Sequence, residues 1–258
     1  KREALKRKME DARARLERRA KKKAEHERVD YEKKLKARQK RKGRKKGGMI
    51  KPLKDMPDSD EQINLTDPDS RIMRKNKRSG YEQSYNPQIT VDAEGSQLIL
   101  SCRASNNASD SRELSANVES IPESVGKPSS VLADSGYICE EEVRAVQEKE
   151  VVVYVSTGAE SKNINRKHDF RPRNRRKSKD KVLRAQWLLE MKEKMETDIG
   201  RALYARRKQT VEPVFGIIKN VMKFREFNLR GLPKIDGEWH LVSLAYNVKR
   251  LWNLKMAM

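Results

Sequence analysis

The order of apolar and polar residues in the middle of the chain predicts strands followed by a helix. Apolar and polar residues alternate over 88–92, residues 92–95 form a turn signal, and residues 98–100 are again apolar. This pattern indicates an antiparallel hairpin. Residues 110–121 then predict a helix, with Asp110 as its N-cap. A small sheet therefore begins in this region.

Two further apolar runs predict a pair of parallel strands. Residues 130–133 (Ser-Val-Leu-Ala) are short and apolar, and residues 151–155 (Val-Val-Val-Tyr-Val) are almost entirely β-branched, which favours a buried strand. Residues 140–148 between them predict a short helix. A strand, a helix and a strand at this spacing form a βαβ unit, so the two strands should be parallel.

The C-terminal part of the chain carries three apolar stripes with helical spacing. Each stripe is most simply the buried face of a helix. Their residues are Leu183, Trp187, Leu188, Met191 and Met195; Val211, Phe215, Ile218 and Met222; and Leu241, Leu244, Ala245, Val248 and Leu251. We therefore expect helices to cover the sheet.

The N-terminal part differs in composition. Residues 1–42 contain no Gly or Pro and are rich in Lys, Arg, Glu and Ala, which favours a solvated helix. Residues 49–80 contain three Pro and many Asp and Ser and should form a loop. We predict a basic helical arm over 1–48, a linker over 49–80 and a main domain over 81–258, with a basic connector at 161–181.

Charge is distributed unevenly along the 258 residues. The formal net charge is +22, with charged residues making up 38% of the chain. Residues 1–48 and 161–258 each carry a net charge of +15, whereas residues 91–160 carry −8. The basic parts should attract a phosphate backbone, while the acidic middle should repel it unless cations neutralise it. A strongly basic chain of this kind most often binds nucleic acid.

Several classes of protein are disfavoured. No apolar run approaches the roughly 18 residues of a membrane span, and the N-terminus lacks the apolar core of a signal peptide. The two cysteines form no disulfide framework, and the three histidines are too far apart for a metal-ligand motif. We expect a cytoplasmic, nucleoid-associated protein. Because the sequence begins Lys-Arg-Glu without Met, we also expect a piece of a longer chain.

Two carboxylates, Asp134 and Glu212, are candidate functional residues because of their positions relative to the predicted elements. Asp134 follows a predicted strand, and ligands of α/β sheets bind beyond the carboxyl ends of strands. Glu212 follows Thr210, which could cap a helix whose N-terminus would stabilise an ionised carboxylate suited to Mg²⁺. Arg206, Arg207, Lys208 and Lys219 would then surround Glu212 with positive charge. Taken singly, Asp134 could simply cap a turn, and Glu212 could simply complement the helix dipole.

Five motifs, in order, resemble bacterial insertion-sequence transposases with a DDE domain. The similarity runs from about residue 64 to about 252. The motifs are Ser79-Gly-Tyr-Glu-Gln-Ser-Tyr-Asn-Pro-Gln-Ile-Thr-Val-Asp92, Leu132-Ala-Asp-Ser-Gly-Tyr137, Tyr204-Ala-Arg-Arg-Lys-Gln-Thr-Val-Glu-Pro-Val-Phe-Gly-Ile-Ile-Lys219, Phe227-Asn-Leu-Arg-Gly-Leu232 and Glu238-Trp-His-Leu-Val-Ser-Leu-Ala-Tyr-Asn247.

The resemblance implies an α/β fold of the RNase H-like type, with a mixed sheet flanked by helices. It implies cleavage and strand transfer at transposon ends with two Mg²⁺ ions, which Mn²⁺ can replace. Asp134 and Glu212 would be catalytic residues and metal ligands. The resemblance also implies DNA as partner, in terminal repeats and target, and a homodimer. The implied DNA-binding residues are Tyr204, Arg206, Arg207, Lys208, Lys219 and Arg230.

One departure from the family pattern concerns the first catalytic Asp, which usually lies in an Asp-Gly-Thr motif on the first strand. No Asp-Gly-Thr occurs in this sequence, so we expect the first strand to be missing. That strand is central in RNase H-like folds, and without it the neighbouring strand edges lack partners. We therefore predict that these 258 residues alone are weakly stable and catalytically inactive.

Two alternatives remain open. The chain could be a non-catalytic, basic DNA-binding remnant of a transposable element, with steep salt dependence and no metal requirement. It could also be an unrelated basic RNA-binding protein, although its few aromatic residues form no evident stacking platform.

Overall fold

The computed structural model describes residues 1–40, 50–74, 79–158 and 183–256. It divides the chain into two compact units, Lys1–Ser84 and Tyr85–Met258. The basic connector expected at 161–181 lies outside the described residues.

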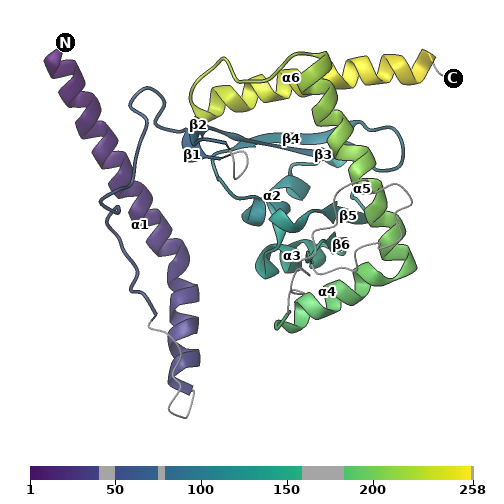
Figure 1. The fold of residues 1–258 in the computed structure, drawn as a ribbon, viewed down its shortest axis with the longest axis horizontal. Coiled ribbons are helices and arrows are strands. Elements are labelled where there is room, and N and C mark those ends of the chain that lie inside the picture. Colours follow the sequence, from purple (N-terminus) through teal and green to yellow (C-terminus); the bar gives the residue numbers. More distant parts are fainter. Residues whose placement is uncertain (41–49, 75–78, 159–182, 257–258) are drawn as a thin grey trace, which may run out of the picture. The chain divides into compact units, whose positions relative to one another are not determined.

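The first unit is built on one long helix, α1 (Arg2–Lys40), which confirms the helix expected from composition (Figure 1). Opposite charges four residues apart stabilise its solvated surface through the pairs Arg13–Glu17, Asp11–Arg15 and Arg28–Glu32. Ala12 and Ala20 are buried, and the Arg19 guanidinium donates a hydrogen bond to the carbonyl of Pro68. The loop that returns from α1 is thus tied to it.

That loop contains a short hairpin that the sequence pattern did not predict. Strand β1 (Arg71–Met73) pairs antiparallel with β2 (Glu82–Ser84). A turn at residues 67–70 precedes it, in which Ser70 N donates to the carbonyl of Asp67 over 3.2 Å. With three residues each, the strands are too short to show an alternating pattern.

The second unit begins with the expected hairpin. Strand β3 (Asn86–Val91) pairs antiparallel with β4 (Ile99–Ser105), with a register shift between Thr90 and Val91. The Asp92 carboxylate accepts hydrogen bonds from Glu94 N (3.1 Å) and Ser96 N (3.0 Å) in the connecting turn. Partial burial opposes ionisation of Asp92, but these bonds and the Ser96 hydroxyl lower its pKa. The sequence thus correctly placed both the strands and the turn.

The predicted βαβ unit follows. Strand β5 (Ser130–Ala133) pairs in parallel with β6 (Val152–Val155), and α3 (Glu140–Gln147) connects them. The described strands form three separate two-stranded sheets, β1–β2, β3–β4 and β5–β6. The molecule is therefore of mixed helix and strand, consistent with the expected α/β class.

The region between the hairpin and β5 differs from the expected single helix. A 3₁₀ turn, Asp110–Arg112, is capped by Ser109, whose side chain accepts from Ser111 N. The helix α2 (Leu114–Glu119) begins only afterwards. The prediction that Asp110 is the N-cap of a helix was wrong. Its side chain accepts hydrogen bonds from Asn86 and Gln88 in the hairpin instead.

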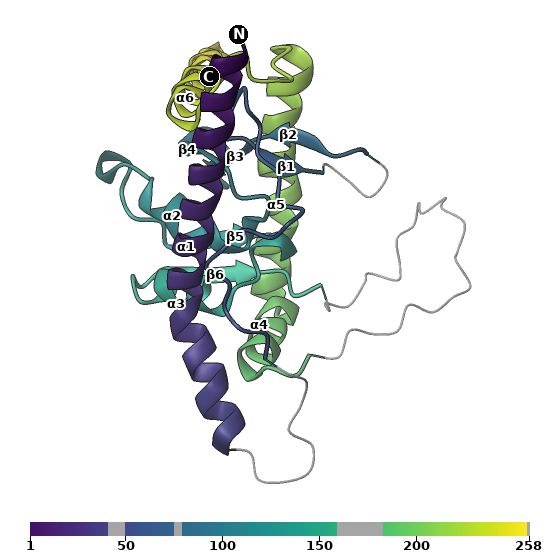
Figure 2. The ribbon, with the colours of Figure 1, turned by 90° about the vertical axis from the view of Figure 1, so that its left-hand side faces the viewer.

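Two helices after residue 183 carry most of the expected stripes, although Leu183 lies before the first helix and Val211 is not part of the second core. Helix α4 (Gln186–Glu196) buries Met191 and Met195 against β5 and β6. Helix α5 (Asp198–Gly216) continues into a π-helical turn, Ile217–Val221 (Figure 2). Val214 and Ile218 pack there with Phe215 and Met222 in a second core beneath the hairpin.

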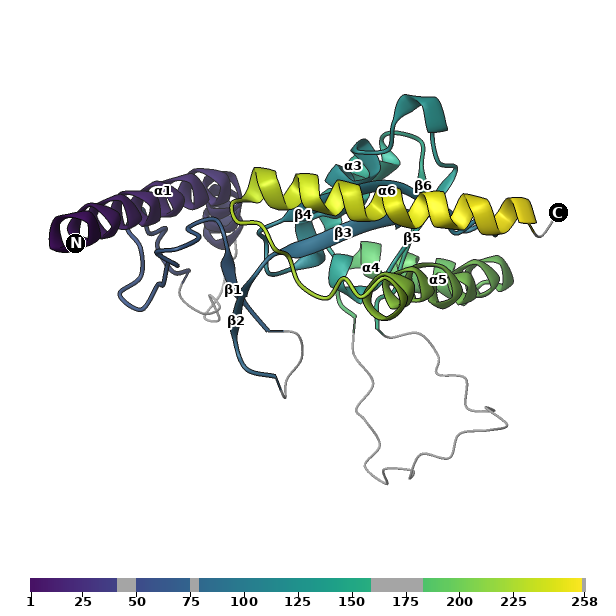
Figure 3. The same ribbon diagram turned by 90° about the horizontal axis from the view of Figure 1, so that it is seen from above.

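The last helix, α6 (Leu232–Met256), lies along the hairpin (Figure 3) but buries a different stripe from the one predicted. Its buried residues are Ile235, Trp239, Ser243 and Tyr246. The expected core residues Leu241, Leu244, Val248 and Leu251 are instead exposed, and so is Ala245. That prediction was wrong because α6 has two candidate stripes.

Polar side chains of α6 decide which stripe faces the hairpin. Asn247 pairs with both the N–H and the carbonyl of Ile99, each over 2.8 Å. Asp236 accepts from Ala104 N over 2.7 Å, and the Trp239 indole donates to the carbonyl of Gln88 over 2.9 Å. These bonds satisfy backbone groups of β3 and β4, which spacing within α6 alone cannot reveal.

Candidate active site

Asp134 lies directly after β5, in the turn that the sequence predicted. Its Oδ1 accepts a hydrogen bond from Gly136 N over 2.7 Å and caps the 3₁₀ turn Ser135–Tyr137. A Cβ atom on Gly136 would lie 2.9 Å from Asp134 Oδ1 and 3.3 Å from Asp110 Oδ2. A larger residue at position 136 would therefore require the Asp134 carboxylate to shift, and the other oxygen of Asp134 remains available for a second contact.

Glu212 lies near the C-terminal end of α5, which corrects the expected helix start at Thr210. The helix begins after Thr197, whose side chain accepts from Gly200 N over 3.0 Å. Thr210 is inside the helix, and its hydroxyl donates to the carbonyl of Arg207 over 3.0 Å. A helix N-terminus therefore does not stabilise the Glu212 carboxylate.

Pro213 misled that prediction because proline is common in the first turn of a helix. Inside α5 it lacks the N–H that would pair with the carbonyl of Gln209. The side-chain amide of Gln97, from the hairpin turn, donates to this carbonyl over 2.7 Å instead. A distant side chain thus replaces the missing helical bond and lets α5 continue past Glu212.

Arg207 brings the two carboxylates together. One guanidinium nitrogen lies 3.8 Å from Asp134 Oδ2, and the other lies 3.7 Å from Glu212 Oε1. The Arg207 side chain is 18% exposed, against 44% for Asp134 and 60% for Glu212. Its buried Nε has no hydrogen-bond partner in the part of the chain that the structure describes. A partly buried cation therefore lies between two more exposed anions.

The other expected basic residues surround this site less closely. Tyr204 lies under Arg207, with 5.6 Å from the guanidinium carbon to the ring centroid. Lys219 is in the π-helical turn, and its ammonium lies 5.1 Å from the centroid of the Phe215 ring. Arg206 and Arg230 are exposed, and the side chain of Lys208 lies outside the described residues. Among the side chains that the structure describes, Arg207 is the cation that pairs with Glu212.

A polar network beside Asp134 was not predicted from the sequence. Asp110 Oδ1 accepts from the side-chain amides of Asn86 (2.6 Å) and Gln88 (2.8 Å). The Tyr137 hydroxyl donates to Gln88 Oε1. Burial, together with the negative charges of Asp110 and Asp134, raises the pKa of Tyr137. The only signal in the sequence was that these residues lie within or beside the quoted motifs.

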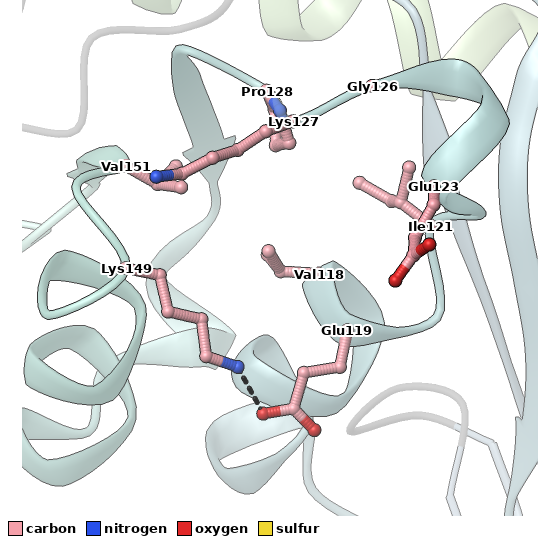
Figure 4. A pocket seen from close by; sticks show the side chains of 9 residues that line it. All are labelled: Val118, Glu119, Ile121, Glu123, Gly126, Lys127, Pro128, Lys149 and Val151. Carbon is pink, nitrogen blue, oxygen red and sulfur yellow. Dashed lines mark hydrogen bonds and ion pairs between the residues drawn. The ribbon is translucent and has the colours of Figure 1, made fainter.

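The structure also contains a hollow at the opposite end of the parallel strands (Figure 4). It has a volume of about 360 Å³ and is lined mainly by the apolar side chains Val118, Ile121, Pro128 and Val151. Pro128 and Val151 precede β5 and β6, whereas Asp134 follows β5. The hollow is therefore not part of the carboxylate site.

Comparison with known families identifies the chain. The model of a family described as "Transposase DDE domain" matches residues 56–248. The chain belongs to the DDE transposase family. No curated protein and no solved structure matches it. This DDE transposase domain includes Asp134, Arg207 and Glu212, and membership of the family associates the chain with DNA transposition and with binding to DNA.

DDE transposases usually use divalent metal ions, so the donor set of this domain can be tested for fit. Asp134 and Glu212 offer carboxylate oxygens, the ligands that Mg²⁺ prefers, and they already share one cation in Arg207. Among the described residues, however, no group of three Asp, Glu, His or Cys side chains is arranged to hold a metal ion. The two carboxylates fit a metal site in part.

No helix in the described part of the DDE transposase chain is long and apolar enough to cross a membrane.

Proposed function

We propose that this chain acts in DNA transposition through metal-dependent cleavage and strand transfer at transposon ends. The observation that carries the proposal is the convergence of Asp134 and Glu212 on one cation within the matched family domain. The two carboxylates would hold Mg²⁺ or Mn²⁺, which activates the attacking oxygen and stabilises the leaving oxygen when bound.

Arg207 has two tasks in this proposal. In the absence of a metal ion its positive charge offsets part of the repulsion between the two carboxylates. Because its guanidinium lies between them, it must move away before an ion can bind both. The displaced guanidinium is then near the site and suited to contact a DNA phosphate, which it can bind through two parallel hydrogen bonds.

The remaining basic residues would position the DNA. Arg206, Lys219 and Arg230 are exposed, so each can approach a phosphate from solvent. Phosphate contacts of this kind supply affinity and register rather than sequence specificity. We propose that Tyr204 orients Arg207 through its ring and that Lys208 contributes to the same surface.

A complete two-metal site needs a third carboxylate beside Asp134 and Glu212. We infer that these 258 residues supply two of the three and that, on their own, they do not cleave DNA. The separation of β3–β4 from β5–β6 is consistent with an RNase H-like sheet that lacks its central strand. Metal-dependent cleavage of plasmid DNA by the purified chain would contradict this inference.

The proposal can be tested on the gene at its own genomic locus, with the surrounding DNA intact. New insertions or excision products are counted by PCR across the element's ends in cells that carry wild type or Glu212→Gln. We expect the variant to reduce their frequency at least about 100-fold, because a metal-ligand oxygen is replaced by a weaker donor. Glu226→Gln, at an exposed position outside the site, should have no effect.

Binding to DNA separates this function from the non-catalytic alternative. The purified Glu212→Gln protein should bind a labelled duplex as tightly as wild type in fluorescence anisotropy, since Glu212 does not contact phosphate in this proposal. Equal transposition by wild type and Glu212→Gln would refute the role of Glu212. A wild-type gene that never transposes, encoding a protein that still binds DNA without added metal, would favour the DNA-binding remnant.

A further inference from the structure

A buried amide on strand β3 joins the hairpin to the turn that carries Asp134. In the described part of the chain, β3–β4 and β5–β6 share no strand pairing. Gln88 on β3 is 3% exposed, and its side-chain oxygen accepts a hydrogen bond from the Tyr137 hydroxyl at the end of that turn. The bond therefore connects two sheets that backbone pairing does not connect. Neither side chain takes part in the proposed metal binding.

The hydrogen bonds of Gln88 fix the direction in which its amide points. Its Oε1 accepts from Asn117 Nδ2 over 2.9 Å and from the Tyr137 hydroxyl. Its Nε2 donates to Asp110 Oδ1 over 2.8 Å. A flipped amide would place its NH₂ group against the amide donor of Asn117 and its oxygen against the Asp110 carboxylate. Both contacts are unfavourable in a buried site, so the oxygen of Gln88 stays directed at Tyr137.

Both partners in this bond are held in place by the rest of the fold. The Trp239 indole of α6 donates to the carbonyl of Gln88 over 2.9 Å, which fixes the backbone of β3 at this position. The Tyr137 ring packs against the apolar core around β5 and β6. Burial and the negative charges of Asp110 and Asp134 raise the pKa of Tyr137, so its hydroxyl stays protonated and can donate.

The place of Tyr137 determines the place of the Asp134 carboxylate, because the turn between them is short. Gly136 N donates to Asp134 Oδ1 over 2.7 Å, and Tyr137 N donates to the carbonyl of Asp134 over 3.2 Å. Ser135 and Gly136 are exposed, so packing restrains them little. A turn without its anchor at Tyr137 is free to rotate, and rotation moves Asp134 Oδ2 from its place 3.8 Å from Arg207.

We propose that Gln88 is a positioning residue of the candidate active site, which acts through the Tyr137 hydroxyl to hold the Asp134 carboxylate toward Glu212. The hairpin thereby sets the separation of two carboxylates that it does not itself carry. This role rests on the proposed function in one respect, since it takes Asp134 as a metal ligand. Groups that orient the ligands of a metal site typically change metal affinity about 10–100-fold when they are removed.

Hydrogen exchange at Gly136 tests the anchor without a metal ion. Tyr137→Phe removes the hydroxyl and keeps the ring in the core, so circular dichroism should show a folded protein. Because the loosened turn opens more often, the Gly136 amide should exchange at least about threefold faster, as measured by NMR of the isotope-labelled chain. Gln88→Met, which removes the amide at a similar side-chain length, should have the same effect. If Gln88→Met does not fold, Tyr137→Phe alone decides the result.

Tyr246→Phe is the matched control for a lost tyrosine hydroxyl. The Tyr246 side chain is buried in the second core, and its hydroxyl donates to the carbonyl of Gln97 over 3.1 Å. The control therefore removes a comparable hydrogen bond away from the turn that carries Asp134. The exchange rate of the Gly136 amide should be the same in Tyr246→Phe as in the wild type.

Binding of Mn²⁺, followed by electron paramagnetic resonance of the free ion, tests the consequence for the site. Tyr137→Phe should lower the affinity for Mn²⁺ about tenfold, whereas Tyr246→Phe should leave it unchanged. In an Asp134→Asn background Tyr137→Phe should have no further effect, because the ligand that it positions is already lost.

The positioning role and the proposed function fail in different ways. Unchanged exchange at Gly136 in Tyr137→Phe would overturn the positioning role. So would a wild-type affinity for Mn²⁺ in Tyr137→Phe when Asp134→Asn weakens binding, or an equally large loss in Tyr246→Phe. If Asp134→Asn itself leaves the affinity unchanged, the metal-ligand role of Asp134 is wrong, and exchange at Gly136 alone then decides whether Gln88 positions its carboxylate.

Discussion

At the scale of single residues, Arg207 links the two candidate metal ligands, Asp134 and Glu212. Its guanidinium lies within 3.8 Å of both Asp134 and Glu212. The sequence singled out both carboxylates as candidates, because one follows a strand and both lie in family motifs, and their catalytic role stays a prediction. It did not identify Arg207 as the cation between them, since its nearness to Asp134 depends on how α5 packs against β5.

Removal of the Arg207 charge should strengthen metal binding by the free protein. We expect Arg207→Gln to raise the affinity for Mn²⁺ about three- to tenfold, because two partly exposed ion pairs, each stabilising by up to ~1 kcal/mol, no longer compete with the ion. Electron paramagnetic resonance of free Mn²⁺ measures this without reference to activity. Arg206→Gln, at the exposed neighbouring position, is the control, and an equal or weaker affinity in Arg207→Gln would contradict the competition.

At the scale of elements, α5 depends on a residue of the hairpin turn to continue through Pro213. Gln97 replaces the bond that Pro213 cannot make to the carbonyl of Gln209. No local pattern indicates this contact, because the two residues are far apart along the chain.

A double-mutant cycle isolates this contact. Gln97→Ala should lower the free energy of unfolding by about 0.5–1.5 kcal/mol, the net contribution of one hydrogen bond. In a Pro213→Ala background the restored N–H of residue 213 can pair with the carbonyl of Gln209. Gln97→Ala should then lower the free energy of unfolding by much less. Urea denaturation of the four proteins gives the coupling energy, and equal costs in both backgrounds would show that Gln97 does not serve this role.

The start of α6 is held by a carboxylate that makes stability depend on pH. Partial burial opposes ionisation of Glu238, but hydrogen bonds from the backbone and side chain of Asn228 and from Leu229 N lower its pKa. A carboxyl whose pKa is lowered by folding stabilises the protein above its unfolded pKa of about 4.3. That contribution is lost as the pH falls through the lower pKa of the folded state.

Replacement of the Glu238 carboxylate should therefore lower the free energy of unfolding at neutral pH but not at acidic pH. We expect Glu238→Gln to lower the free energy of unfolding by about 1 kcal/mol at pH 7 and to have little effect at a pH where wild-type Glu238 is itself protonated. Urea denaturation across this range measures the difference, with Glu226→Gln as the exposed control. A constant difference between wild type and Glu238→Gln at all pH values would exclude this linkage.

At the scale of the whole molecule, the net charge of +22 governs binding to DNA. Contacts between Lys or Arg and phosphates release condensed counterions, so affinity falls steeply with salt. If six or more phosphates are contacted, the affinity for a duplex should fall at least about a thousandfold between 50 and 200 mM salt. Fluorescence anisotropy at several salt concentrations measures the slope, and a nearly flat dependence would argue against an extended phosphate contact.

Local patterns in the sequence by themselves determined most of the elements and the family. The helix α1 follows from composition. The β3–β4 hairpin, the parallel pair β5–β6 and the helices α3, α4 and α6 follow from spacing and turn residues, because these signals act between residues close along the chain. The boundaries expected at residues 48 and 80 stay a prediction. The five ordered motifs gave the family without any structure.

Only the tertiary structure decided which surfaces those elements bury and which side chains meet. Helix α6 has two apolar stripes, and hydrogen bonds from Trp239 and Asn247 to the hairpin select the one that is buried. Asp110 was expected to cap a helix, but its side chain accepts a hydrogen bond from Gln88 on β3. Arg207 on α5 forms an ion pair with Asp134, which follows β5. Each outcome depends on contacts between residues far apart in the chain, which periodicity and local propensity do not encode.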